Sequence, residues 1–130
     1  MPIITQHRYY RSDAQRNRGV LYVFGDNVAR EGYGGQAKEM RDEPNAVGVR
    51  TKVAPTMRPN DFFSDSYYDD AVAMIEDDLR RVVDHLEKGG IVVLPADGLG
   101  TGLSELPTRA PRIHAYLEAR LQKLIDDYDL

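Results

Sequence analysis

Two continuous apolar runs in the sequence each stop at a glycine-rich segment. The first run, residues 20–24, leads into Gly-Asp-Asn at residues 25–27 and then into a glycine cluster at residues 32–37. The second run, residues 91–94, leads into residues 95–102, where three glycines alternate with other residues. Uninterrupted apolar runs of this length are typical of strands buried on both faces, as in a parallel sheet. Both glycine-rich segments are therefore expected to follow the carboxyl ends of strands.

Periodicity and turn signals predict the remaining elements. Residues 66–88 carry apolar side chains at spacings of three and four, which predicts an amphipathic helix. Asp65 or Ser66 is expected to cap its start, and the glycines at 89–90 are expected to end it in left-handed conformations. The other expected elements are an edge-like strand over residues 3–10, a loop over 11–19, a short helix over 35–41, a strand over 46–51, a loop over 53–59 and a last helix from Thr108, with Pro111 in its first turn.

This alternation of strands and helices predicts an α/β fold. A chain of 130 residues suffices for one ordinary domain and not for two. The expected architecture is therefore a single-domain three-layer sandwich over residues 1–130, with a mixed, largely parallel sheet. Because the carboxyl ends of parallel strands meet at one edge, the two glycine-rich loops are expected to line one pocket.

Composition and charge narrow the classes of function. The chain contains no cysteine, which excludes disulfides, thiol catalysis and thiolate metal sites; the sequence predicts no metal and no cofactor. The formal net charge of -4 disfavours nonspecific binding of nucleic acid. No secretory signal and no apolar run of membrane-spanning length is present, so we expect a cytoplasmic protein without a membrane partner. Acidic residues 76–78 are expected on the solvated face of their helix.

The first glycine-rich loop has the features of a nucleotide site. Gly34 and Gly35 leave the backbone bare for the close approach of a ligand, and a short helix is predicted to begin there. The unpaired N–H groups and the positive dipole end of a helix start attract anions. Asp26 and Asn27 can hydrogen-bond a ribose or a base, or they can act as turn formers that bond their own backbone. The sequence favours contact between at least one of these two side chains and a ligand.

The second glycine-rich loop can form a phosphate-binding nest. Glycines at 98, 100 and 102 allow successive backbone N–H groups to wrap a phosphate, and Thr101 adds a hydroxyl; a flexible connector is the alternative. Asp97, at the strand end, is a candidate general base or ribose ligand. Thr51 and Lys52 are expected to reach the same edge from the middle strand, where a lysine suits a phosphate or carboxylate, although an exposed lysine is the commoner case.

The predictions for the site can be stated residue by residue. The candidate catalytic residues are Asn27, which would position water or ribose, and Asp97, which would act as a base. The ligand is expected to be a nucleotide-like small molecule. The residues predicted to bind it are Gly25, Asp26, Asn27, Gly34, Gly35, Gln36, Thr51, Lys52, Asp97, Gly98, Leu99, Gly100, Thr101 and Gly102.

With these loops placed, the chain resembles a reduced macro domain, the ADP-ribose-binding α/β family. Residues 24–27 and 34–37 resemble that family's Asn-containing strand end and the glycine-rich loop that opens a helix, and residues 95–102 resemble its diphosphate loop. The resemblance covers roughly residues 20–117 and extends to small uncharacterised bacterial and phage proteins. It implies binding of ADP-ribose or a related nucleotide diphosphate, with hydrolysis of an ADP-ribosyl or phosphate bond as an extension. The aspartate with which that family recognises adenine, early in its sequence, has no counterpart before residue 20. Gln36 stands where hydrolytic members carry an acidic residue or another catalytic group. The resemblance therefore implies ligand binding more strongly than hydrolysis.

Two alternative functions stay open at the level of sequence. Residues 98–101, with Glu105 after them, also resemble the glycine loop of phosphoribohydrolase-like nucleotide-processing enzymes, although Ala96 and Asp97 replace that family's paired glycines. A phage or bacterial protein-interaction module without a small ligand is the other alternative. It is suggested by an uneven charge distribution, with arginines at 8, 11, 16 and 18 and aspartates at 126, 127 and 129.

Overall fold

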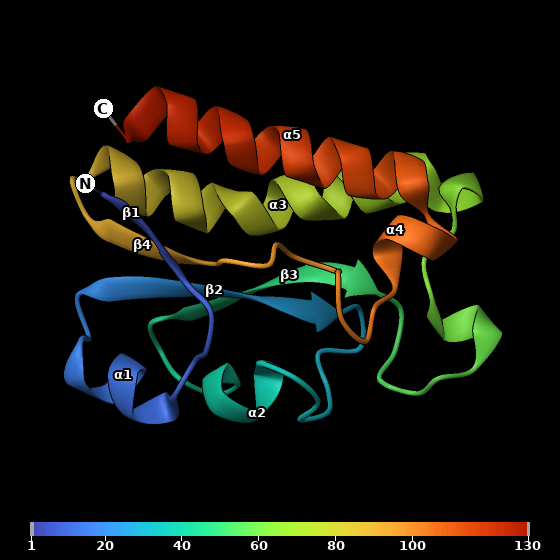
Figure 1. The fold of residues 1–130 in the computed structure, drawn as a ribbon, viewed down its shortest axis with the longest axis horizontal. Helices are drawn as coiled ribbons and strands as arrows, with labels where there is room; N and C mark the ends of the chain where they lie inside the picture. Colours follow the sequence, from blue (N-terminus) through green and yellow to red (C-terminus); the bar gives the residue numbers. More distant parts are fainter. Residues whose placement is uncertain (1, 130) are drawn as a thin grey trace.

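The computed structural model describes residues 2–129, and its secondary structure is arranged in three layers (Figure 1). The middle layer is a four-stranded sheet in the order β1-β4-β2-β3. Every strand pair in it is parallel, so the expectation of a mixed sheet was wrong for the described residues. The strands are β1 (Ile3–Gln6), β2 (Val20–Asn27), β3 (Ala46–Lys52) and β4 (Ile91–Pro95).

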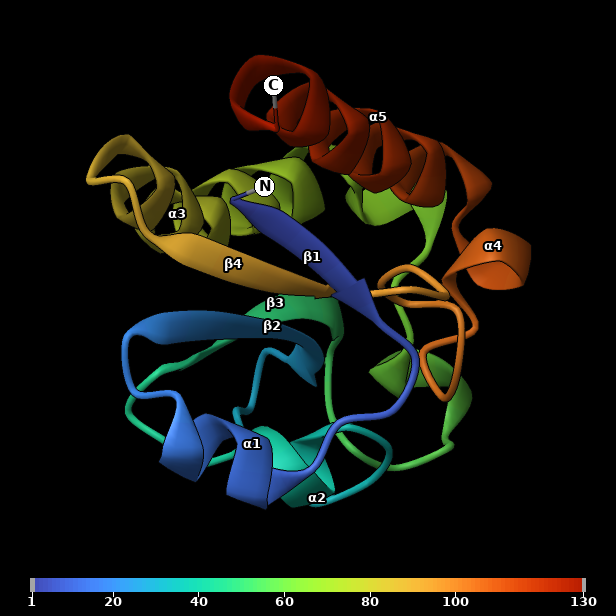
Figure 2. The ribbon, with the colours of Figure 1, turned by 60° about the vertical axis from the view of Figure 1, so that its left-hand side comes forward.

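Helices cover both faces of the sheet (Figure 2). The two long helices α3 (Tyr68–Glu87) and α5 (Pro111–Tyr128) lie on one face, and α1 (Arg11–Arg16) and α2 (Ala37–Met40) lie on the other. This arrangement confirms the prediction of an α/β sandwich. The segment that was expected to be a loop over 11–19 contains α1, which is anchored by the buried Ala14.

Each face of the sheet has its own hydrophobic core, which explains the unbroken apolar run of β2. Leu21 and Val23 belong to the core beneath α3 and α5, together with Ile75 and Leu117 of those helices. Tyr22 and Phe24 belong to the second core, beneath α1 and α2. Because successive side chains of a strand alternate between faces, a strand buried on both sides needs apolar residues at every position.

The ends of the long helices differ from expectation. No side-chain cap is present at the start of α3, which is preceded by a 3₁₀ turn, η2 (Asp65–Tyr67). The Asp65 carboxylate instead accepts hydrogen bonds from the backbone N–H groups of Arg112 (3.1 Å) and Ile113 (3.2 Å), and so caps α5. Gly89 follows α3 with a φ of +81°, as predicted, whereas Gly90 is not left-handed.

The last predicted helix is two helices. A short helix, α4 (Leu106–Arg109), precedes α5, and the backbone at Ala110 breaks the helical conformation between them. The loop before α4 is the second glycine-rich segment, and α4 lies beside it at the carboxyl edge of the sheet (Figure 1). A second 3₁₀ turn, η1 (Pro59–Asp61), lies between β3 and α3. The segment between β3 and η2 therefore crosses the same edge.

Candidate functional site

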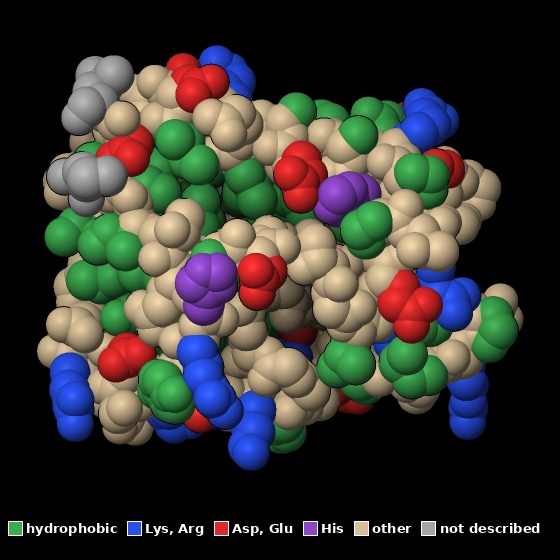
Figure 3. Space-filling model, in the orientation of Figure 1, with side chains coloured by type: hydrophobic (Ala, Val, Ile, Leu, Met, Phe, Trp, Pro, Cys, Tyr) green, Lys and Arg blue, Asp and Glu red, His purple; other side chains and the backbone are tan. Residues whose placement is uncertain are grey.

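A cleft lies at the carboxyl edge of the sheet, where the loops after β2 and β4 meet. Its larger part has a volume of about 240 Å³ and its smaller part about 80 Å³. The two parts share Gly25, Gly34, Leu103 and Ser104. In the space-filling view the surface is hollowed between these loops (Figure 3). The structure thus brings together the two loops that the sequence predicted to share a pocket.

Most predicted site residues line this cleft, but they divide between its two parts. Asp26, Asn27 and Lys52 line only the smaller part. The residues that line the larger part are Gly25, Gly34, Gly35, Gln36, Asp97, Gly98, Leu99, Gly100, Thr101, Gly102, Leu103 and Ser104. Thr51 does not line either part.

The second loop lines the larger part of the cleft and contains a row of backbone N–H groups without hydrogen-bond partners. Its ends are fixed, because the N–H of Gly98 donates to the Pro95 carbonyl (3.1 Å) and the N–H of Leu106 donates to the Gly100 carbonyl (2.8 Å). Between them, the N–H groups of residues 99–104 find no hydrogen-bond acceptor within residues 2–129. Gly98 and Gly100 have positive φ angles (+86° and +78°), the left-handed conformation that a phosphate-binding nest uses at alternate residues.

Packing beneath the second loop holds this backbone in place. The hydroxyl groups of Thr51 and Ser104 are 2.7 Å apart, and Thr51 is fully buried. The Leu99 side chain is part of the main hydrophobic core, so only its backbone is available to a ligand. A Cβ at Gly100 would lie 2.8 Å from Leu106 Cδ2, inside the protein. The glycine at 100 is therefore required by packing and by its positive φ, whether or not its backbone contacts a ligand.

The start of α2 has fewer free N–H groups than the anion site expected there would use. The helix has only four residues. The N–H groups of Ala37 and Lys38 already donate to the carbonyls of Gly34 and Gly35, at 3.2 and 3.3 Å. The first glycine-rich loop also contributes backbone N–H groups, at residues 32–36, that have no hydrogen-bond acceptor within residues 2–129, and Gly34, Gly35 and Gln36 line the larger part of the cleft.

Asp26 and Asn27 brace the first loop from below. The buried Asp26 carboxylate is 2.5 Å from Arg41 Nη2 and 3.0 Å from Arg30 Nη1, and Arg41 also donates to the Gly32 carbonyl (2.7 Å). The Asn27 amide donates to the Glu31 carbonyl (2.8 Å) and accepts from the N–H of the same residue (3.4 Å). Both side chains thus act as turn and loop formers, the alternative considered from the sequence.

A buried charge network extends from this brace to α3. The Asp78 carboxylate is 2.7 Å from Arg30 Nη2 and 3.0 Å from Arg50 Nη2, and it accepts the backbone N–H of Arg50 (2.8 Å). Its side chain is only 3% exposed. The expectation that all of residues 76–78 lie on a solvated face was therefore wrong, since Asp78 ties α3 to β3 and, through Arg30, to the end of β2.

Lys52 is buried and partnered. Its ammonium donates to the carbonyls of Ala54 (3.0 Å) and Thr56, and it lies 4.3 Å from the centre of the Phe62 ring. Burial lowers the pKa of the Lys52 ammonium below its ordinary value. Arg109 lies 3.7 Å from the centre of the same ring. The lysine thus anchors the segment after β3 beside the cleft.

Asp97 stands at the exposed rim. Its side chain is 77% exposed, and one oxygen is 3.7 Å from Nδ1 of His7, which is equally accessible. Because Asn27 lines the smaller part of the cleft and Asp97 the larger, the two candidate catalytic residues face different spaces. Glu105, the residue that carried the phosphoribohydrolase resemblance, pairs with Arg109 at 3.0 Å and does not line the cleft.

Two further features of the described chain bear on function. Within residues 2–129, no cluster of three or more His, Asp or Glu side chains is suitable for holding a metal ion. None of the helices in that range combines the length and the apolar character needed to cross a bilayer.

Comparison with known proteins assigns the chain to a family. A family of unknown function, DUF7831, matches residues 4–120. The chain belongs to this family. No curated protein and no solved structure matches it. The matched range includes both loops of the cleft, all of β2, β3 and β4, β1 except its first residue, and the first ten residues of α5.

The residues that sequence reasoning missed are the supports of the loops. Arg41 and Ser104 were not among the predicted site residues, and Asp78 was expected only as part of a solvated helix face. An arginine fifteen residues from its carboxylate partner leaves no local pattern in the sequence. The serine alone had a usable signal, since a hydroxyl placed directly after a glycine loop is suited to fixing that loop.

Proposed function

We propose that the cleft binds the diphosphate of a nucleotide such as ADP-ribose. The observation that carries this proposal is the row of backbone N–H groups at residues 99–104, which have no acceptor within the described chain and line a cleft at the carboxyl edge of a parallel sheet. Ligands of open α/β sheets bind at that edge, and convergent backbone N–H groups favour phosphate oxygens. Neither a metal ion nor a basic side chain is needed for such a contact.

The shape of the cleft supports a ligand that extends beyond it. A volume of about 240 Å³ is smaller than pockets that enclose a whole drug-sized ligand, so the diphosphate and a ribose would lie inside and the base outside. Tyr33 and Leu103 are 60% and 56% exposed and lie on the two loops, where they offer apolar surface to a base. The order of the two loops along the chain, which resembles that of macro domains, supports the same ligand class.

The proposal is one of binding. Hydrolysis would need a water-positioning residue and a base that face the same bond. The Asn27 amide is already bonded at both ends to Glu31, and Asp97 lines the other part of the cleft. The geometry therefore supports ligand recognition better than turnover.

Calorimetry with ADP-ribose, ADP, NAD and adenosine tests this function. We expect the three phosphate-containing ligands to bind and adenosine, which has no phosphate, to bind at least about tenfold more weakly, a difference of about 1.4 kcal/mol. Absence of heat and of a thermal shift with all four ligands would remove the proposal. Equal affinity for ADP and adenosine would show that the free N–H groups do not contact phosphate.

A matched set of variants localises the contact. Gly102 lines the cleft, its φ is not positive, and a Cβ there would have no heavy atom within 4 Å, so Gly102→Asp adds a negative charge without a packing clash. We expect it to weaken ADP binding by about tenfold or more at low salt, through repulsion over a few ångströms. Gly102→Asn is the neutral control. Gly19→Asp is the charge control, because Gly19 is equally open and precedes β2 at the opposite end of the sheet.

A further inference from the structure

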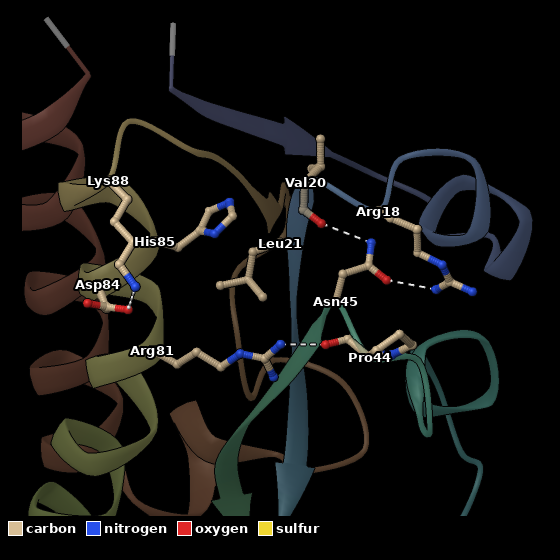
Figure 4. A pocket seen from close by; sticks show the side chains of 9 residues that line it. All are labelled: Arg18, Val20, Leu21, Pro44, Asn45, Arg81, Asp84, His85 and Lys88. Atoms are coloured by element: carbon tan, nitrogen blue, oxygen red, sulfur yellow. Dashed lines mark hydrogen bonds and ion pairs between the residues drawn. The ribbon is translucent and has the colours of Figure 1, made fainter.

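A second pocket lies at the opposite edge of the sheet, where β2 and β3 begin (Figure 4). Its volume is about 400 Å³, within the range of pockets that hold small organic ligands. The last turns of α3 form one wall with Arg81, Asp84 and His85, and Lys88 directly follows the helix. The start of β2 and the turn before β3 form the other, where Val20 and Pro44 supply apolar surface above the buried Leu21. None of its lining residues belongs to the cleft described above.

The charged groups of this pocket are unbalanced. Arg18, Arg81 and Lys88 line it, against the single carboxylate of Asp84. The Lys88 ammonium is 2.9 Å from Asp84, but both side chains are largely exposed, so this pair is screened and weak. Arg18 shares the Glu43 carboxylate with a second arginine, Arg11. The pocket is thus locally cationic on a chain whose formal net charge is -4.

Arg81 has donor capacity that the fold does not use. Its guanidinium donates to the carbonyls of Pro44 and Ala46, the latter at 3.1 Å, and it forms no ion pair within residues 2–129. A guanidinium has five N–H donors and remains charged at all relevant pH values. These two contacts with neutral carbonyls fix the group across the mouth of the pocket and leave further donors, and the whole charge, for an anion.

His85 forms a rigid wall beside this cation. Its ring packs against Gly90, where a Cβ would lie only 2.4 Å from His85 Nε2, so the ring occupies the space that a side chain at 90 would fill. His85 Nε2 is buried without a hydrogen-bond partner in the described chain. A flat ring beside Leu21 is suited to contact with the apolar body of a small molecule (Figure 4).

We propose that this second pocket binds a small organic anion with an apolar body. Arg81 and Lys88 would hold a carboxylate or a phosphate ester, and Val20, Pro44 and the ring of His85 would contact the body. The recognised chemistry is one anionic group on a compact apolar frame. This site is separate from the proposed nucleotide cleft and does not depend on it.

Backbone-amide NMR titration of the full chain tests the proposal with three probes: benzoate, phenyl phosphate and neutral benzyl alcohol. We expect at least one anion to bind with a dissociation constant of about 1 mM or tighter and the alcohol to bind about tenfold more weakly. Benzoate should cause shifts at Leu21, Asn45 and Lys88 and not at residues 98–102, whereas shifts at 98–102 with phenyl phosphate would report the proposed nucleotide cleft and are analysed separately. Binding of benzoate alone would identify a carboxylate ligand, and binding of phenyl phosphate alone a phosphate ester.

Substitution at neighbouring arginines provides the matched comparison. Arg81→Gln should weaken the binding of the anion by about tenfold, whereas Arg80→Gln should leave it unchanged, because the Arg80 side chain is 81% exposed and does not line the pocket. Lys88→Gln serves if Arg81→Gln does not fold, since the Lys88 side chain is 74% exposed. Equal affinity of wild type and the pocket variant, absence of shifts at the pocket residues with both anions, or equal binding of benzyl alcohol and the anions would overturn the proposal.

Discussion

The Asp26 carboxylate supports both the fold and the first loop of the cleft, so its replacement by asparagine is a direct test of the structural interpretation. Asp26→Asn keeps the size of the side chain and removes its charge. The 2.5 Å pair with Arg41 and the 3.0 Å pair with Arg30 would each lose their anion. Arg41 would then keep its contacts with the carbonyls of Glu31 and Gly32 while its own charge is buried without a counter-ion.

The two arginines contribute unequally to the expected loss of stability. The Arg41 side chain is 10% exposed and that of Arg30 is 42% exposed. Removing one member of a buried pair costs about 3–5 kcal/mol, whereas the partly exposed pair is screened by solvent and contributes less than about 1 kcal/mol. Because the asparagine amide can still accept one hydrogen bond, we expect a loss near the lower limit, about 3 kcal/mol. A domain with about 5–15 kcal/mol of stability remains folded after this loss.

Urea unfolding followed by circular dichroism measures this loss, and a thermal melt should show a decrease of about 10 °C. The matched control is Asp77→Asn, which makes the same chemical change at a carboxylate that is 62% exposed and 3.6 Å from its nearest arginine. The control should change stability by less than about 0.5 kcal/mol. Calorimetry on the folded Asp26→Asn protein should also show weaker binding of ADP-ribose, because the first loop has lost its anchor.

A double-mutant cycle separates the ion pair from other effects of the substitution. Asp26→Asn combined with Arg41→Gln should recover part of the loss, giving a coupling energy of about 1–3 kcal/mol. If Asp26→Asn is as stable as Asp77→Asn, or if the cycle shows no coupling, then the buried carboxylate does not brace the loop and the reasoning is refuted.

Two further predictions concern tyrosines on opposite sides of the sheet. The buried Tyr9 hydroxyl donates to the Val23 carbonyl (2.8 Å), so Tyr9→Phe should lower the free energy of unfolding by about 1–2 kcal/mol in urea, and an unchanged midpoint would contradict this contact. Burial, together with the hydrogen bond to Glu76, raises the pKa of Tyr116 from 10.0 to about 12. Because the pKa of Tyr116 is higher in the folded state, its protonated hydroxyl contributes fully to the free energy of unfolding below pH 10, and this contribution is lost as the pH rises through 12. Between these pH values, the urea midpoint of wild type should therefore fall more steeply than that of Tyr116→Phe.

The elements of the fold were predictable wherever one strong local pattern acted alone. The apolar runs at β2 and β4 and the amphipathic period of α3 follow from burial on both faces of a strand or on one face of a helix. The six-residue α1 was missed because it buries only Ala14 and so has no amphipathic period to detect. The capping role of Asp65 was assigned to the wrong helix, since its true partner, α5, begins more than forty residues later.

The sequence predicted where the two loops of the candidate site meet. It did not predict which residues hold these loops in place. Strand ends and glycines indicated where the loops meet, because these signals are local. The identity of the residues that hold the loops depends on long-range pairs such as Asp26 with Arg41 and Thr51 with Ser104. A polar residue beside a glycine loop gives the same sequence pattern whether it contacts a ligand or anchors the loop. Only its contacts in the folded structure distinguish these two roles.

The glycines of the second loop show how that distinction can be made. At Gly100 a side chain would meet Leu106, and at Gly98 the positive φ of +86° already favours glycine, so the fold explains both. Neither reason applies at Gly102, where the φ is not positive and a Cβ would meet nothing within 4 Å. A ligand that approaches the bare backbone of this position would supply the missing reason. Gly102 is the one glycine of this loop whose substitution leaves the packing of the protein intact. Comparison of its asparagine and aspartate variants therefore separates the effect of side-chain size on ligand binding from the effect of charge.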